Sequence, residues 1–155
     1  MGVETQLTLL GRAALAALLG FAIGLERESR GKSAGERTFA LLALAAAGVT
    51  GLGSLLLGPD AESRIVQGIL AGVGFLGAGA IFRRGTGDVR GLTTAAGAWA
   101  ATAIGILAGA GAYLVSVLGA VLVLVILELD QIPVLRRIHD RAMSSGSQPQ
   151  GDGPP

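Results

Sequence analysis

The stretch that decides the fold is 7–57, which reads LTLLGRAALAALLGFAIGL (7–25), ERESRGKSAGER (26–37) and TFALLALAAAGVTGLGSLLL (38–57). Two apolar segments, each near the roughly 20 residues that cross a bilayer as a helix, flank a short charged one. The apolar segment 65–82 follows, and 92–127 is long enough for two spans joined at the glycine-rich break 108–111. The pattern predicts an all-α membrane bundle of about five helices, near 7–25, 38–57, 65–82, 92–107 and 112–128.

The composition indicates a chain whose solvent is lipid. Hydrophobic residues make up 51% and charged residues 15%, whereas soluble domains average about 25% charged residues. The mean hydropathy is +0.63. The net charge of +1 provides no basic excess for nucleic-acid binding, and the absence of cysteine excludes disulfides and thiolate chemistry. The lipid bilayer is therefore the first expected partner.

The basic residues predict the orientation of the spans. Five spans place ten of the twelve basic residues on one side, which the positive-inside rule makes the cytoplasm. The N-terminus is then outside and the C-terminus cytoplasmic. A cleaved signal peptide is disfavoured, because no positive side chain precedes the first apolar segment. The residues expected on the cytoplasmic side are Arg27, Arg30, Lys32, Arg37, Arg83, Arg84, Arg90, Arg136, Arg137 and Arg141.

Glycine, with 26 residues, is the expected means of helix packing. Small residues let helices approach closely in a bilayer, where lipid provides no hydrophobic drive for association. The segment 65–82 carries glycine on two faces, so we predict that it is the central helix of the bundle. Such faces are also compatible with a homo-oligomer. The predicted packing residues are Gly20, Gly24, Gly68, Gly72, Gly74, Gly77 and Gly79.

Charged residues of both signs lie where the first span ends and the second begins. One interpretation is a fixed network in which Glu26 and Arg37 link two helix ends, with Arg27 as a further member. The alternative is an ordinary solvated loop whose ion pairs contribute about 0–1 kcal/mol, and the sequence leaves both open. Thr38 is expected to start the second helix.

The start of the fourth span is the second candidate region. Thr93 and Thr94 are expected to cap the helix and to bond neighbouring helices. The helix N-terminus together with Arg90 also suits an anion, although the structural interpretation is favoured. Trp99 lies well inside its span and is expected to pack against other helices.

Arg12 lies about five residues into the first span and has two interpretations. Its side chain can extend outward to the interface, which is the favoured one. It can instead face the bundle interior and meet an acid such as Asp60 or Glu62.

The remaining residues predict no catalytic chemistry. No acid occupies the middle of a span, and the sole histidine, His139, lies in the tail, so we expect no enzyme, no cofactor and no metal ligands. We divide the chain into a membrane domain (1–130), a short basic juxtamembrane segment (131–141) and a disordered tail (142–155).

Four motifs occur in an order that resembles the MgtC/SapB family of bacterial membrane proteins. They are GFAIGLERE (20–28), AGERT (34–38), GVGFLGAGAI (72–81) and VRGLTTAAGAW (89–99). Carried over by motif, the resemblance indicates as residues to test Glu26, Arg27, Arg37, Thr38, Arg90, Thr93, Thr94 and Trp99. It implies an inner-membrane protein of about five helices, and this chain is similar to the short form without a soluble C-terminal domain.

The resemblance also implies a class of function. Members are associated with magnesium limitation, acid stress, intracellular survival and virulence, and one is implicated in restraining the F-type ATP synthase. We therefore expect a non-enzymatic protein that regulates another membrane complex. The alternative is a transporter or channel for magnesium or another small solute, which the glycine-rich third segment and the Thr/Arg-rich start of the fourth would support.

Overall fold

The computed structural model describes residues 1–84 and 88–129. The predicted juxtamembrane segment 131–141 and tail 142–155 lie outside the described residues. The chain divides into two compact units, Met1–Val123 and Leu124–Pro155. The first unit contains four complete helices and most of a fifth, and it carries every contact described below.

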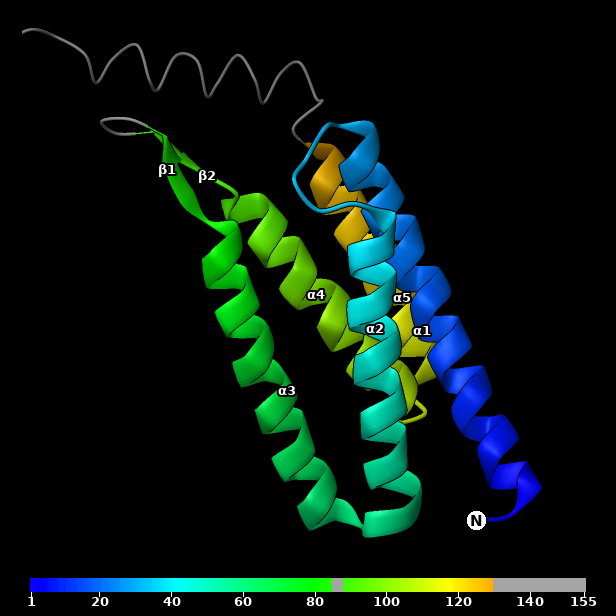
Figure 1. Ribbon diagram of the computed structural model, residues 1–155. Helices are drawn as coiled ribbons and strands as arrows, with labels where there is room; N and C mark the ends of the chain where they lie inside the picture. Colours follow the sequence, from blue (N-terminus) through cyan, green and yellow to red (C-terminus); the bar gives the residue numbers. More distant parts are fainter. Residues whose placement is uncertain (85–87, 130–155) are drawn as a thin grey trace, which may run out of the picture. The chain divides into compact units, whose positions relative to one another are not determined.

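Five α-helices occur in the described part of the chain (Figure 1). They are α1 (Val3–Ser29), α2 (Glu36–Leu52), α3 (Pro59–Ala80), α4 (Leu92–Gly109) and α5 (Tyr113–Glu128). A π-helical turn, η1 (Gly53–Leu57), extends α2, and two short strands, β1 (Phe82–Arg84) and β2 (Asp88–Arg90), separate α3 from α4.

Four of these helical segments are long and apolar enough to cross a membrane, namely Val3–Ser29, Glu36–Leu57, Pro59–Ala80 and Leu92–Gly109. The apolar helix α5 is shorter. The all-α, multi-span fold class predicted from the sequence is therefore confirmed, while the orientation in the membrane stays a prediction. Most large hydrophobic side chains of these helices are exposed in the single chain, as lipid-facing residues must be.

The centre of the first unit is α2, which touches α1 on one side and α4 on the other through glycines. A Cβ atom added at Gly20 of α1 would lie 2.5 Å from the carbonyl oxygen of Phe39. One added at Gly109 of α4 would lie 2.5 Å from the carbonyl oxygen of Ala47. Because even a methyl group would not fit, the backbones of these helices are in direct contact at both interfaces.

Alanine completes this core. Ala16 of α1, Ala43 and Ala47 of α2, and Ala108 of α4 are fully buried and form one cluster. Lipid tails are as apolar as leucine, so large side chains would gain little by leaving lipid. Small side chains instead allow many backbone atoms to come into van der Waals contact, which holds α1, α2 and α4 together.

The prediction that 65–82 forms the central helix is wrong. Of the residues of α3 only Val73 is buried, and Figure 1 shows α3 beside the group formed by α1, α2 and α4. A Cβ atom at Gly77 would meet Ala95 of α4 at 3.6 Å. At Gly68, Gly72, Gly74 and Gly79 it would meet no described atom within 4 Å. Glycine spacing indicates a face suited to close packing, but it does not say which helix supplies the partner.

The two short strands were not foreseen, because the sequence predicted a plain loop at 83–91. They pair antiparallel, with Phe82 opposite Arg90 and Arg84 opposite Asp88. The turn into α4 is made at Gly91, whose φ of 92° lies in the left-handed region. A Cβ atom there would collide with the carbonyl oxygen of Ala80, so the end of α3 and the start of α4 approach each other only because residue 91 is glycine.

Two buried hydroxyl groups within the spans have backbone partners. The Thr102 hydroxyl donates to the carbonyl oxygen of Ala98 in the preceding turn of α4, at 2.9 Å. The Ser116 hydroxyl of α5 donates to the carbonyl oxygen of Ile104 in α4, at 3.0 Å. Since unpaired polar groups are costly in lipid, these bonds satisfy the hydroxyls, and the second also links two helices.

Candidate functional site

A buried ionic cluster lies at the end of α1. The Arg27 side chain is 2% exposed and the Glu26 side chain 9%. The Arg27 Nη2 donates to Glu26 Oε1 at 2.6 Å, and its Nε pairs with Glu26 Oε2. Arg30, one turn further along the helix, pairs with the same carboxylate through its Nε. Two arginines therefore share one carboxylate, and the Nη1 of Arg27 is buried without a hydrogen-bond partner among the described residues.

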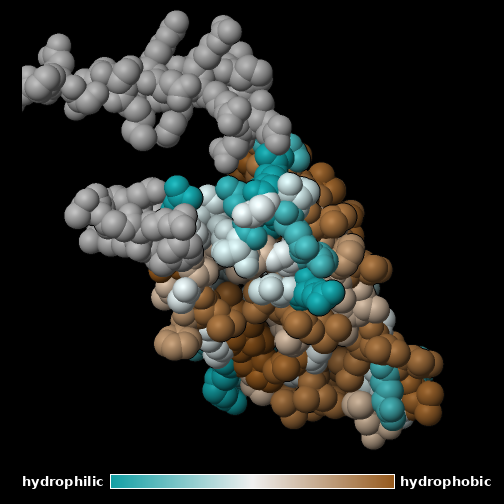
Figure 2. Space-filling view, turned by 45° about the horizontal axis from the view of Figure 1, so that its top comes forward, coloured by the Kyte–Doolittle hydropathy of each residue, from teal (hydrophilic) through white to brown (hydrophobic). Residues whose placement is uncertain are grey.

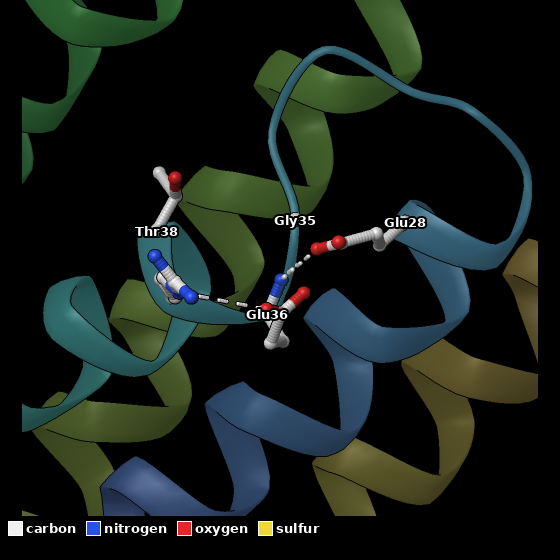
Figure 3. Close-up of a pocket in the computed structure, with 5 residues that line it drawn as sticks. Glu28, Gly35, Glu36 and Thr38 are labelled. Carbon is white, nitrogen blue, oxygen red and sulfur yellow. Dashed lines mark hydrogen bonds and ion pairs between the residues drawn. The ribbon is translucent and has the colours of Figure 1, made fainter.

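The link between the first two helices is made by Glu28, not by Glu26 and Arg37. Figure 3 shows Glu28 pointing from the end of α1 toward the start of α2, where its Oε2 accepts the backbone N–H of Glu36 at 3.4 Å. Glycine makes this approach possible, because a Cβ atom at Gly24 would lie 2.5 Å from the Cα of Glu36. A carboxylate beside the first amides of a helix is also favourable for the helix dipole.

The predicted cross-link between Glu26 and Arg37 is wrong. Glu26 faces Arg30 because residues four apart share one face of a helix. Arg37 points away, with a side chain that is 92% exposed and 3.8 Å from the Glu36 carboxylate. The helix also begins at Glu36, two residues before the predicted start, so Thr38 lies inside its first turn and is exposed. Both side chains belong to the outer surface of this end of the bundle.

The start of α4 places its three predicted residues differently. Gly91 occupies the N-cap position, and no side chain caps the helix, so the predicted capping role of Thr93 and Thr94 is wrong. Thr93 is exposed, whereas Thr94 is 3% exposed. Thr94 and Arg90 line a pocket of about 540 Å³ together with Arg30, Lys32 and Ser33 of the α1–α2 connection. The two regions that the sequence singled out are therefore adjacent.

The sequence predicted that Trp99 packs against other helices inside the bundle, and this prediction is wrong for the single chain. Its side chain is 48% exposed in the single chain. The adjacent residues Gly97 and Ala98 are buried instead, and a Cβ atom at Gly97 would meet the ring of Phe39 at 3.2 Å. Trp99 therefore lies on the outward face of α4, where its large ring suits lipid or another protein.

Arg12 is a residue whose partners the sequence did not reveal. Its Nη1 donates to the carbonyl oxygen of Gly109 at 2.6 Å, and its Nε donates to the Tyr113 hydroxyl at 3.1 Å. Its guanidinium also lies 5.8 Å from the centre of the Tyr113 ring. A cation beside the last carbonyls of α4 is favourable for the helix dipole. Arg12 thus joins α1, α4 and α5. It turns toward neighbouring helices, as the second interpretation expected, but its partners are Gly109 and Tyr113 instead of Asp60 or Glu62.

We expect Arg12→Gln to lower the free energy of unfolding by about 1.5–3 kcal/mol, the usual contribution of a hydrogen bond to a charged group. Tyr113→Phe should cost less, since the bond from Arg12 to Gly109 remains. Thermal unfolding of the detergent-solubilised protein measures both. Equal stability of Arg12→Gln and wild type would show that the Gly109 contact contributes nothing.

Metal chemistry finds no support within the described residues. No three His, Cys, Asp or Glu side chains there lie close enough together to hold a metal ion. Of the acids of the candidate site, Glu26 is paired with arginines and Glu28 with a backbone amide.

Fold and site together define a class, a multi-span helical membrane protein with a glycine-packed core and a charged cluster at one end. This chain belongs to the MgtC family, whose sequence model matches residues 13–134. It is 39% identical over 130 residues to Protein MgtC of Brucella abortus, covering 84% of this chain and 54% of that protein. It is 50% identical over 98 residues to Protein MgtC of Salmonella typhimurium, covering 63% and 42%.

The chain spans about half the length of the curated relatives it matches. No solved structure matches it.

Proposed function

We propose that this protein is a non-enzymatic protein of the bacterial inner membrane that regulates another membrane complex. The observation that carries the proposal is an exposed basic surface on a rigid support. Arg37 is 92% exposed, and Lys32 is exposed on the connection before it. Figure 2 shows hydrophilic residues gathered at the end that is turned forward, with hydrophobic residues over much of the remaining visible face.

The support for this surface is formed by the end of α1 and the start of α2. It is rigid because the two backbones are in contact where no side chain would fit. Gly24 brings α1 against the first turn of α2, and the Glu26–Arg27–Arg30 cluster holds the helix end from which the connection leaves. A preorganised surface loses little conformational entropy when it binds a partner. The exposed cations at this end suit a partner with an acidic surface.

The same packing weighs against a solute path through the centre of the bundle. The backbone of α2 contacts α1 and α4 directly at Gly20 and Gly109, so no path runs between these three helices where they touch. This supports a binding role over the alternative role as a transporter or channel for magnesium or another small solute.

Family membership suggests the partner and the conditions. We propose the F-type ATP synthase as the partner, in magnesium limitation, acid stress or intracellular survival. Homo-oligomers of this chain are compatible with the proposal. Because the chain covers about half of its curated relatives, the proposal is made for this chain and its own residues.

The test is copurification with the ATP synthase combined with an activity assay. We expect the tagged full chain to retain the synthase from solubilised bacterial membranes and to lower ATP hydrolysis in inverted vesicles. Arg37→Glu should reduce both effects severalfold, since it reverses an exposed charge at the proposed surface. Arg64→Glu is the matched control, because Arg64 is an exposed arginine near the start of α3.

Two outcomes would contradict the proposal. One is the absence of enrichment and of any change in ATP hydrolysis with well-folded protein. The other is saturable magnesium flux into proteoliposomes containing the purified protein alone, which would establish the transporter instead.

A further inference from the structure

The pocket beside the start of α4 has the residues of an anion site. Its volume of about 540 Å³ falls within the range of roughly 300–1,000 Å³ that is usual for ligand pockets. Two chain segments far apart in sequence form it: Arg30, Lys32 and Ser33 follow α1, while Arg90, Gly91 and Thr94 begin α4. We propose that this pocket binds a phosphate group, a role that goes beyond the regulatory function proposed above.

The charge of the lining is the first reason. Arg30, Lys32 and Arg90 contribute three positive charges, and none of the described lining residues is acidic. Glu26 lies nearby, but its carboxylate is shared between Arg27 and Arg30. Glu26 also holds the Arg30 guanidinium in place, which fixes one cation at the pocket wall before a ligand arrives.

The helix start is the second reason. The first amides of a helix have no partner within it, and no side chain caps α4. Gly91 contributes no side chain, and its left-handed φ of 92° is the conformation that turns β2 into the helix. Backbone amides at such a helix start, together with the helix dipole, favour an anion.

Thr94 is the third and independent reason. It is 3% exposed, yet it lines the pocket. A bound oxyanion would accept a hydrogen bond from its hydroxyl, because the hydroxyl of threonine can donate as well as accept.

Phosphate is the anion class that fits these donors best. Guanidinium and ammonium groups, backbone amides and one hydroxyl are all donors, and a phosphate offers several acceptor oxygens in different directions. The pocket lies where the span α1 ends and the span α4 begins, and the exposed apolar side chains of Leu25 and Leu92 lie on those helices. Two sources of the same chemistry can therefore reach it, a phospholipid headgroup and a soluble phosphate.

The test measures binding to the purified full chain in a neutral detergent. Native mass spectrometry with phosphatidylglycerol and with dioleoylglycerol, which has no phosphate, measures lipid binding. Titration calorimetry with inorganic phosphate measures the soluble anion. We expect phosphatidylglycerol to bind more tightly than dioleoylglycerol. If phosphatidylglycerol binds and inorganic phosphate does not, the ligand is a phospholipid headgroup. If inorganic phosphate binds and competes with the lipid, the pocket accepts phosphate from both sources.

Two pocket variants and a control test the location. Lys32→Gln should weaken binding of the anion about tenfold, as expected for the loss of one charged hydrogen bond. Lys32→Gln/Arg90→Gln should weaken it further. Arg37→Gln removes an exposed cation at the same end but outside the pocket and should bind as wild type does. Lys32 is exposed, so its variant is expected to fold normally.

The proposal is overturned if neither probe binds the well-folded wild type. It is equally overturned if Lys32→Gln binds as tightly as Arg37→Gln does, because the anion would then respond to the general positive charge of this end of the bundle and not to the pocket.

Discussion

Glu26→Ala should lower the free energy of unfolding by about 3–5 kcal/mol, the usual cost of breaking a buried ion pair. The Arg27 side chain is 2% exposed, and it would lose the partner of its Nε and Nη2. Its Nη1 already has no partner among the described residues. The substitution would therefore leave a buried, uncompensated guanidinium, which is more costly than the loss of the pair itself.

A double variant separates these two effects. In Glu26→Leu/Arg27→Leu both charges are gone, and apolar replacement of a buried pair is often nearly neutral. We expect it to recover much of the stability that Glu26→Ala loses. Arg37→Ala, at a 92% exposed side chain, is the surface control and should stay within about 0.5 kcal/mol of wild type. Unfolding in mixed micelles measures all three, and equal losses for Glu26→Ala and Arg37→Ala would contradict the buried cluster.

Gly105→Ala is expected to destabilise the bundle by about 1–3 kcal/mol, because the core has no room for the added methyl group. A Cβ atom at Gly105 would lie 2.9 Å from the Cα of Ala43, which belongs to the backbone of α2 and cannot move aside locally. The helices α2 and α4 would have to separate, which would also disturb the contact between Gly109 and Ala47.

The matched control is Gly72→Ala on α3. The substitution is the same, but a Cβ atom at Gly72 meets no described atom within 4 Å. Alanine favours a helix over glycine, so this variant should be as stable as wild type or slightly more so. The midpoint of thermal aggregation in detergent compares the two variants. If Gly72→Ala proves the more damaging one, α3 has a packing partner outside the single chain, such as a second copy.

Much of the architecture could be predicted because it depends on length and composition. The runs 7–25 and 38–57 are apolar over about the thickness of a bilayer, and the structure has α1 and α2 there, extended at their polar ends to Val3, Ser29 and Glu36. The start of α3 at Pro59, six residues before the predicted span, could not be read from hydropathy, because its first turn carries Asp60 and Glu62.

The candidate site was predictable in location but not in pairing. The sequence placed charges of both signs between α1 and α2, yet it paired Glu26 with Arg37 where the structure pairs Glu26 with Arg27 and Arg30. The pairing depends on helix phase and on where α2 begins, and an error of two residues at Glu36 turns a side chain by about 200°. The partner of Arg12 was hidden for a similar reason, since Gly109 and Tyr113 are distant in sequence.

By itself, the sequence determined that this is a helical, multi-span membrane protein, because runs of apolar residues about as long as a bilayer is thick have few other stable solutions in lipid. Its ordered motifs also indicated the family. Only the tertiary structure decided that α2 is the central helix, that α3 lies beside it, and that Arg30, Lys32 and Arg90 meet at one pocket. Those outcomes depend on which glycine faces which backbone, a contact between segments distant in sequence that no local pattern specifies.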